Sequence, residues 1–236
     1  MAMSKPDRVK LIPAYSLAGA ARLLGSNPST LRDWFHGHNY SDVGRRQRTS
    51  PMLSTRSKPG QPISFIDLVE AHVFLLIRQR YRIPMKRVKT ASETLSKLRG
   101  GLTFLAHEDF YFDSKNIFLQ IDEQLISLSE NGQIVEKDIV EKGLKQLNYG
   151  SDGFASEFFP RLGEVEQKDF VISPNRNFGR LCIARSGISA DIIAVRFDRG
   201  EKISDIANDY AATADEIEQA IRWHNRLHQR DDRAAA

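Results

Sequence analysis

Two short helical patterns separated by a tight turn constrain the fold of this chain most strongly. In the first pattern, the apolar residues follow the i, i+3, i+4, i+7 spacing of one helix face: Leu17, Ala20, Ala21 and Leu24. Gly25 suits the left-handed position that commonly ends a helix, and Asn27-Pro28 offers an N-cap followed by a first-turn proline. The spacing predicts a helix-turn-helix unit, and an αα-hairpin inside a larger bundle fits it equally well.

The second helix of this unit begins with short polar side chains and a cation. Its apolar residues, which we expect to pack inward, fall at i, i+3 and i+4: Leu31, Trp34 and Phe35. In a helix-turn-helix unit, the first residues of the second helix face the major groove of DNA. We therefore predict DNA contacts from Ser29, Thr30 and Arg32.

A long basic segment without a helical period follows, from His36 to Pro62. Only Asp42 opposes its cations, which are Arg45, Arg46, Arg48, Arg56 and Lys58. A loop of this length in a compact domain is more often functional or disordered than structural. We expect a wing that lies along DNA phosphates through Arg45, Arg46 and Arg48, because the arginine fork can bind two phosphate oxygens. A basic linker is the alternative.

The net charge of +4 conceals a strong asymmetry along the chain. Residues 1–99 hold 18 Lys and Arg against 6 Asp and Glu, a net of +12. Residues 100–170 hold 6 against 14, and residues 171–236 hold 10 of each. The basic first block indicates a polyanionic partner, with nucleic acid the leading candidate. A charged surface that binds nothing is the alternative.

Two further helices are predicted after the basic segment. Ser64-x-x-Asp67 is a capping box at the start of the first of them. The apolar face of that helix comprises Phe65, Leu68, Val69, His72 and Leu76, with the histidine in a core or boundary position. Pro84 starts the second helix, which Gly100-Gly101 ends.

The middle of the chain has a different pattern of apolar residues. Short apolar runs at 110–112, 117–121 and 125–128 predict a small antiparallel β meander. We expect a helix at 140–147. The acidic stretch 150–167 is expected to be irregular and to hold a domain boundary.

Three helices are expected to close the chain, after apolar runs at 170–172 and 181–183. The last of them opens with a second capping box, Thr213-x-x-Glu216, directly after a tight turn at Ala211-Ala212. This gives a second helix-turn-helix-like unit, but its second helix begins with Asp215, Glu216 and Glu218. These carboxylates would repel phosphates, so we expect a protein partner or structural packing here.

Residues that support catalysis or metal binding are sparse. The sequence has no Gly-rich phosphate loop, GxSxG elbow or HExxH motif. Cys182, the sole cysteine, lies in an apolar run and is expected to be a buried, inert thiol. His36-x-His38 and His224-x3-His228 each pair two imidazoles without an obvious third ligand, so surface histidines are expected. We predict no enzyme, catalytic residue, metal or cofactor.

The sequence also indicates a cytoplasmic setting. No run approaches the ~18 apolar residues of a membrane span, and residues 1–10 lack the apolar stretch of a signal peptide. One cysteine excludes an intramolecular disulfide. We expect a cytoplasmic protein with no membrane partner.

The stretch from Ser16 to Trp34 resembles the opening of MerR-like winged helix-turn-helix regulators, most clearly at Thr30-Leu-Arg32. The predicted helices at 63–70 and 84–88 sit where that family has its helices after the wing. A long dimerising coiled coil, which MerR regulators usually have, is not evident after Leu98.

The final stretch, from Gly179 through Tyr210 to Arg222, looks like the small C-terminal three-helix domain of a class of VapB-like antitoxins. Both ends together resemble those antitoxins over nearly all of the chain. The family's usual Gly-Thr-Arg-Ile segment is replaced here by Arg185-Ser-Gly-Ile188, which leaves the role of that loop open.

The resemblance implies that the chain neutralises a PIN-like ribonuclease toxin and autorepresses its operon by binding the promoter. A homodimer is expected because operators are commonly palindromic. A PIN-like site is a carboxylate cluster that holds metal, so an inserted arginine could occupy it. The candidates in the last helix and tail are Arg222, Arg226, Arg230 and Arg233, which could instead simply solvate a terminal helix.

The predicted fold is α+β and mainly helical. Residues 1–101 form a winged helix-turn-helix domain with two following helices, in which 12–62 bind DNA. Residues 102–169 form a small α/β middle segment, and 170–236 a three-helix domain. Two alternatives remain: a free-standing MerR-like regulator with an effector pocket lined by Phe104, Phe110 and Phe112, and a protein adaptor that does not bind DNA.

Overall fold

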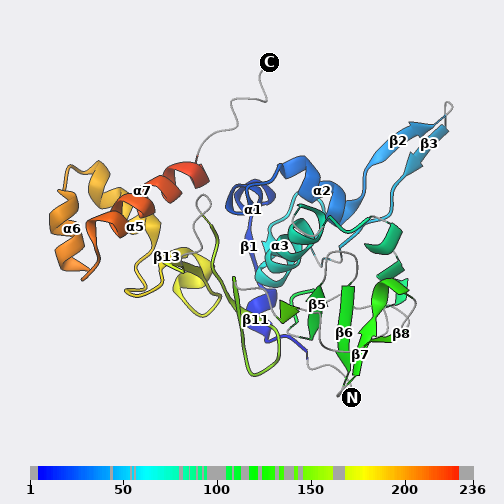
Figure 1. Cartoon of the computed structure of the whole chain (residues 1–236). Helices are drawn as coiled ribbons and strands as arrows, with labels where there is room; N and C mark the ends of the chain where they lie inside the picture. The colour runs from blue at the N-terminus through cyan, green and yellow to red at the C-terminus, as the bar shows by residue number, and fades with distance from the viewer. Residues whose placement is uncertain are drawn as a thin grey trace.

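The computed structural model describes the chain at residues 5–42, 45–53, 55, 57–79, 82–84, 86–88, 90–91, 93–94, 105–107, 109–112, 117–121, 124–130, 133–135, 141–142, 146–161 and 168–228. The fold is α+β, as predicted, with helices toward both ends and small antiparallel sheets (Figure 1). Each helix within these ranges is too short or too polar to span a lipid bilayer.

The N-terminal part contains the predicted pair of short helices and a β-hairpin. Its elements are η1 (Arg8–Leu11), β1 (Pro13–Tyr15), α1 (Leu17–Leu24), α2 (Pro28–His36), β2 (Asn39–Asp42), β3 (Arg45–Arg48), β4 (Ile63–Ser64) and α3 (Phe65–Gln79). Strand β1 pairs antiparallel with β4, and β2 pairs antiparallel with β3. The described residues between 86 and 94 are helical, in agreement with the helix predicted after Pro84.

The middle of the chain forms the predicted antiparallel meander. Its strands are β5 (Phe110–Phe112), β6 (Ile117–Ile121), β7 (Gln124–Ser127), β8 (Gln133–Val135) and β9 (Glu141–Lys142), with the turn η2 (Leu128–Glu130) between β7 and β8. They form one sheet in the order β8-β7-β6-β5-β9. Its described side chains on β5 and β6 are buried. Because consecutive strand residues point to opposite faces, the sheet is covered on both faces at these strands.

A second sheet joins the middle of the chain to its last part. Its order is β10 (Leu147–Tyr149), β11 (Ala155–Phe158), β12 (Phe170–Ile172) and β13 (Leu181–Ile183), and every pairing is antiparallel. Because β11 pairs with β12, this sheet contains strands from both sides of the expected domain boundary between residues 169 and 170. The turn before β13 is η4 (Asn177–Gly179).

Three helices follow the second sheet, as predicted. They are α5 (Ala190–Asp198), α6 (Ile203–Asp209) and α7 (Ala214–His228). The capping box of α7 is present: the N–H of Thr213 donates to Oε2 of Glu216 over 2.7 Å, and the N–H of Glu216 donates to Oγ1 of Thr213 over 3.1 Å. Helix α7 packs on both α5 and α6.

Two local predictions in the middle of the chain are wrong. The expected helix at 140–147 contains strands instead, since Lys142 of β9 pairs with Tyr111 and Leu147 of β10 pairs with Phe158. The expected irregular stretch 150–167 contains β11. Short apolar runs carry no decisive period, and strand pairing determined both outcomes. Strand β9 pairs with the distant β5, whereas β11 pairs with its neighbours in sequence, β10 and β12. Residues 162–167 lie outside the described ranges.

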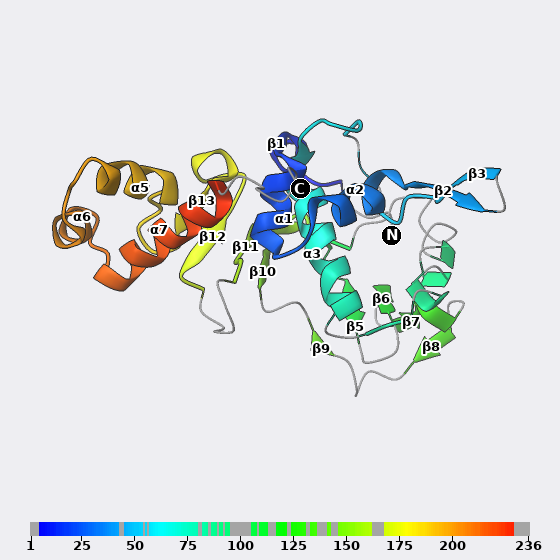
Figure 2. The ribbon, with the colours of Figure 1, turned by 90° about the horizontal axis from the view of Figure 1, so that it is seen from above.

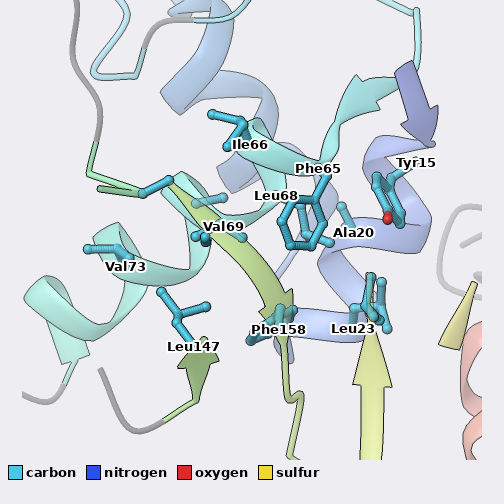
Figure 3. Close-up of a cluster of buried hydrophobic side chains, with 14 of the residues drawn as sticks. Tyr15, Ala20, Leu23, Phe65, Ile66, Leu68, Val69, Val73, Leu147 and Phe158 are labelled. Atoms are coloured by element: carbon cyan, nitrogen blue, oxygen red, sulfur yellow. The ribbon is translucent and has the colours of Figure 1, made fainter. Parts of the chain in front are cut away.

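Helix α3 lies at the centre of the main hydrophobic core (Figure 3). Its capping box is present, because the N–H and hydroxyl of Ser64 both donate to Oδ2 of Asp67 over 2.8 Å. The predicted apolar face is confirmed, and residues on the other sides of the helix are buried as well, including Glu70. His72 is buried beside Phe158, with ring centroids 4.6 Å apart, so its predicted core position is confirmed.

Two buried contacts attach the N-terminal segment to later parts of the chain. The side chain of Lys10 is 2% exposed. Its ammonium lies 2.6 Å from Oδ1 of Asp152 and also donates to the carbonyl of Phe154 over 3.1 Å. The hydroxyl of Tyr15 donates to the carbonyl of Gly179 over 2.9 Å. Residues more than 140 positions apart therefore meet through polar contacts in the interior.

Replacing Asp152 with Asn should destabilise the fold by about 3 kcal/mol at neutral pH, because Lys10 would stay buried without its carboxylate. Burial opposes ionisation of Asp152, but hydrogen bonds from Lys10, Asp7 and Phe154 leave its pKa below the ordinary value. The wild-type advantage is therefore complete above about pH 4 and is lost as the pH falls through the lower pKa of the folded state.

Urea unfolding of wild type and Asp152→Asn at a series of pH values measures this difference. The exposed Asp198 provides a control, and Asp198→Asn should leave stability nearly unchanged. Equal unfolding free energies for wild type and Asp152→Asn at pH 7 would contradict the role of the buried pair.

Candidate nucleic-acid interface

The turn between α1 and α2 has the geometry that its residues predict. Gly25 adopts a left-handed conformation, with φ 64°, and its N–H donates to carbonyls at the end of α1. Asn27 then caps α2, since its side chain accepts the N–H of Ser29 over 3.1 Å, and Pro28 occupies the first turn. A left-handed glycine followed directly by a capped helix start makes the turn between α1 and α2 short and sharp.

The start of α2 presents its polar side chains to solvent. Ser29 is exposed, Thr30 is half-buried and the side chain of Arg32 is 62% exposed. Leu31 and Phe35, on the opposite side, are buried as predicted. The helix therefore has one face anchored in the core and one face free to enter a groove.

The basic segment after α2 forms a β-hairpin that projects from the body of the molecule (Figures 1 and 2). Strands β2 and β3 pair in register, with Asp42 opposite Arg45, Ser41 opposite Arg46 and Asn39 opposite Arg48. The predicted wing thus has a regular structure, and all three predicted arginines lie on its second strand. We refer to residues 39–48 as the wing.

Hydrogen bonds at the base of the wing attach it to the end of α2. The guanidinium of Arg48 donates to the carbonyl of His36 over 2.8 Å. The N–H of Thr49 donates to the carbonyl of His38 over 2.9 Å, and the N–H of His38 donates to the hydroxyl of Thr49 over 2.9 Å. The N–H groups of Met52 and Leu53 both donate to the carbonyl of Trp34. These contacts hold the wing at a defined position beside α2.

Burial and then the charge of Arg48 lower the pKa of His36, with the carboxylate of Asp67 acting in the opposite direction. His36 is buried, so an uncharged imidazole suits its position under the base of the wing. His38 is exposed and lies 3.7 Å from the carboxylate of Asp33. The two histidines of this pair therefore occupy different environments, and a surface position is confirmed only for His38.

Helix α7 packs against α1 of the helix-turn-helix unit (Figures 1 and 2). The guanidinium of Arg226 lies within 3.1 Å of the position that a Cβ on Gly25 would take, and it also covers the ring of Trp223. Trp223 itself is fully buried. The C-terminal helix therefore supports the corner of the helix-turn-helix unit from behind.

The predicted toxin-contacting arginines have different surroundings. Arg222 is 64% exposed and pairs with Glu218 one turn earlier, whereas Arg226 is engaged with Trp223 and the α1–α2 corner. Arg230 and Arg233 lie outside the described residues. Of these four candidates, Arg222 has the described side chain that is most available to a partner.

The acidic start of α7 is neutralised in part within the chain. Arg185 lies 2.9 Å from Glu216, which also accepts the capping hydrogen bond from Thr213. Burial works against ionisation of Glu216, but these hydrogen bonds hold its pKa below the ordinary value. Arg185 belongs to the segment Arg185-Ser-Gly-Ile188, so that segment has a structural contact with α7.

Two features of the C-terminal part could not have been predicted from the sequence. Asp191 of α5 lies 2.9 Å from Nδ1 of His224, a contact between positions 33 apart. Phe178 is 93% exposed in a left-handed conformation with φ 56°.

Cys182 is buried as expected, and burial raises the pKa of its thiol, as suits an inert side chain.

Comparisons with known proteins match both ends of the chain. Residues 13–92 match a family described as "Putative DNA-binding HTH domain", and residues 171–223 match a family described as "Protein of unknown function (DUF433)". A curated relative from Mycobacterium tuberculosis, "Putative antitoxin VapB45", is 26% identical over 89% of this chain and 93% of its own length.

The fold is also similar to a solved structure. The crystal structure of Rv2018 from Mycobacterium tuberculosis matches 89% of this chain and 98% of its own, with a TM-score of 0.59 and 20% identity. The resemblance of this chain to VapB-like antitoxins with an N-terminal helix-turn-helix domain is therefore confirmed over most of its length.

Replacing Gly37 with Ala should damage the base of the wing. At Gly37, with φ 69°, a new Cβ would lie 2.1 Å from the carbonyl oxygen of Thr49. Gly60→Ala is the matched control, because Gly60 has φ 83° with nothing within 4 Å of the new Cβ. We expect Gly60→Ala to cost about 1 kcal/mol from its backbone conformation. Gly37→Ala should cost a further ~2 kcal/mol, from the steric overlap and from a ψ of 170°, which at positive φ is essentially restricted to glycine.

Denaturant unfolding of the two variants gives both free energies. Equal losses in Gly37→Ala and Gly60→Ala would show that the base of the wing accommodates the added Cβ beside Thr49 without cost.

Proposed function

We propose that this chain is an antitoxin that binds the promoter of its own operon and neutralises a PIN-like ribonuclease toxin. The helix-turn-helix domain would repress transcription, and the C-terminal part would contact the toxin. The name of the Mycobacterium tuberculosis relative and the description of the family at residues 13–92 support the two halves of this proposal.

The single observation that carries the DNA-binding half is that the wing extends from the end of α2, the helix whose first turn carries the exposed polar side chains. The wing is attached to the end of α2 through Arg48 and Thr49, so both elements present a fixed surface. A helix of this diameter fits the major groove of DNA, and a basic β-hairpin at its side can follow the adjacent phosphates.

The residues on this surface have distinct chemical roles in the proposal. Ser29, Thr30 and Arg32 would contact base edges, where arginine prefers guanine and hydroxyl groups accept or donate. Arg45, Arg46 and Arg48 would contact phosphates, which provide affinity and orientation. Arg48 would have a second role, because its hydrogen bond to His36 also positions the wing. A homodimer would place two such surfaces on a palindromic operator.

For the toxin-binding half, we propose contacts from Arg222 and from exposed apolar side chains of the C-terminal part. These side chains are Phe178, Ile192, Val195 and Phe197. Hydrogen bonds around Phe178 fix its turn, since Asn177 donates to the carbonyl of Gly187 and Arg176 donates to that of Ala184. An exposed aromatic side chain held in an unfavourable backbone conformation is typical of a binding residue.

An effector pocket in the β-containing middle is less favoured by the structure. Phe110, expected to line such a pocket, is 3% exposed and belongs to the main hydrophobic core. Phe104 lies outside the described residues, as does the side chain of Phe112.

Removal of single arginines should separate base contacts from phosphate contacts. Arg32→Ala should weaken binding to the upstream operon DNA by ~1 kcal/mol or more, because a base contact is lost. Arg45→Ala should reduce the slope of log K against log salt by about 1, because one phosphate contact is lost. Arg199, exposed on the C-terminal part, provides the control substitution Arg199→Ala.

Gel-shift titrations at two salt concentrations measure both effects. If Arg32→Ala and Arg45→Ala match wild type, the assigned surface is wrong. If wild type itself fails to bind the upstream DNA, the adaptor hypothesis replaces the proposal.

The toxin-binding half predicts that a ribonuclease encoded by the neighbouring gene copurifies with this chain. Phe178→Ala and Arg222→Ala should each weaken that complex at least tenfold, about 1.4 kcal/mol, because each removes a proposed contact. Ile12, an apolar residue that is 57% exposed near the N-terminus, provides the control Ile12→Ala. Failure of wild type to copurify a nuclease would contradict the antitoxin proposal.

A further inference from the structure

The C-terminal helices bring together three metal-ligating side chains that are far apart in sequence. Asp191 lies in the first turn of α5, and His224 and His228 lie one turn apart near the end of α7. One potential ligand atom from each residue lies within 4.8 Å of the other two. The third ligand that the histidine pair lacked in the sequence is therefore supplied by α5. We propose that Asp191, His224 and His228 bind a divalent transition-metal ion.

The hydrogen bonds of the two histidines favour coordination. Nδ1 of His228 lies 2.9 Å from the carbonyl oxygen of His224. A carbonyl oxygen only accepts, so this nitrogen carries the proton and the lone pair of Nε2 is free to bind a metal ion. A hydrogen bond from the second ring nitrogen to a backbone carbonyl is the usual way in which proteins orient a metal-binding histidine.

His224 and Asp191 form the second part of the site. Nδ1 of His224 lies 2.9 Å from Oδ1 of Asp191, so the imidazole and the carboxylate share one proton in the metal-free protein. A metal ion can replace that proton, because both atoms have lone pairs directed toward the space between them. Metal bonds of ~2.0–2.2 Å to nitrogen and oxygen require ligand atoms only slightly further apart than this pair.

The site lies between two helices and remains open to solvent. The two imidazoles are stacked, with centroids 4.1 Å apart, so the rings must turn toward each other for both ring nitrogens to bind one ion. His224 and Asp191 are half-buried and His228 is exposed, so an ion can enter while water fills the remaining coordination positions. Two imidazoles and one carboxylate with an open position suit Zn²⁺, Ni²⁺ or Co²⁺ better than Mg²⁺ or Ca²⁺, which prefer oxygen ligands.

An ion at this site would connect the end of α7 to the start of α5. Helix α7 also packs on α1 of the helix-turn-helix unit, so the ion would stabilise the helix that supports the DNA-facing corner. This inference does not depend on the proposed antitoxin function, because it rests on the three side chains alone.

Isothermal titration of the tag-free, chelator-treated full chain with ZnCl₂ tests the proposal. We expect one ion per chain, and at least tenfold weaker binding in both His228→Ala and Asp191→Asn. His38→Ala removes an exposed histidine outside the site and is the matched control. No binding by wild type, or unchanged affinity in His228→Ala, would overturn the proposal.

A second readout separates a metal site from a structural contact between α5 and α7. Zn²⁺ should raise the melting temperature of wild type and His38→Ala, and it should leave that of His228→Ala unchanged. Titration of wild type with CoCl₂ should give visible absorption bands of a four- or five-coordinate ion, and this measurement requires no variant to fold. Absence of both the stabilisation and these bands would also overturn the proposal.

Discussion

The burial of α3 on nearly every side is the constraint on which the rest of the structure depends. A helix that is apolar around most of its circumference must be covered in all directions. Strands β1 and β4 and the turn η1 cover it from the N-terminal part, and β11 covers it from the middle of the chain. Trp34 of α2 meets Phe74 of α3 edge to face, with centroids 4.7 Å apart. The helix that faces DNA in our proposal is thus seated on the central helix of the core.

This arrangement makes the DNA-facing unit dependent on both later parts of the chain. Lys10 and Tyr15 anchor the N-terminal segment to residues 152 and 179, and α7 packs behind α1. One hydrophobic cluster includes residues of α1, α3, β11 and α7. A partner that binds α7 or the η4 turn would therefore contact elements that are in direct contact with the helix-turn-helix unit. The contact between Tyr15 and Gly179 joins residues on opposite sides of both expected domain boundaries, at 101/102 and 169/170.

Local sequence signals predicted the structure correctly wherever a residue type has a single structural consequence. The left-handed Gly25, the Asn27 cap and the capping boxes at Ser64 and Thr213 are all present, because each depends on neighbours within four positions. The wing was predicted only as a basic loop, because its strands have no apolar alternation that would indicate a hairpin. The strand at 147–149 pairs with the nearby β11, whereas the strand at 141–142 replaced part of an expected helix because its partner β5 is distant in sequence. Asp191 could not be assigned to the histidine pair for the same reason.

The polar residues inside α3 show how the same burial limits the conditions under which the core is stable. Burial, and then the nearby charge of Asp67, raise the pKa of Glu70 well above its ordinary value, so the folded protein favours the protonated carboxyl more than the unfolded chain does. Burial, and then the charge of Arg161, lower the pKa of His72 to about 3. A carboxyl group with a raised pKa disfavours folding as the pH rises above its ordinary value, because the unfolded chain releases its proton. An imidazole with a lowered pKa disfavours folding as the pH falls below its ordinary value, because the unfolded chain binds a proton. The two residues therefore oppose folding from opposite directions of pH, and the apolar contacts around α3 must offset both.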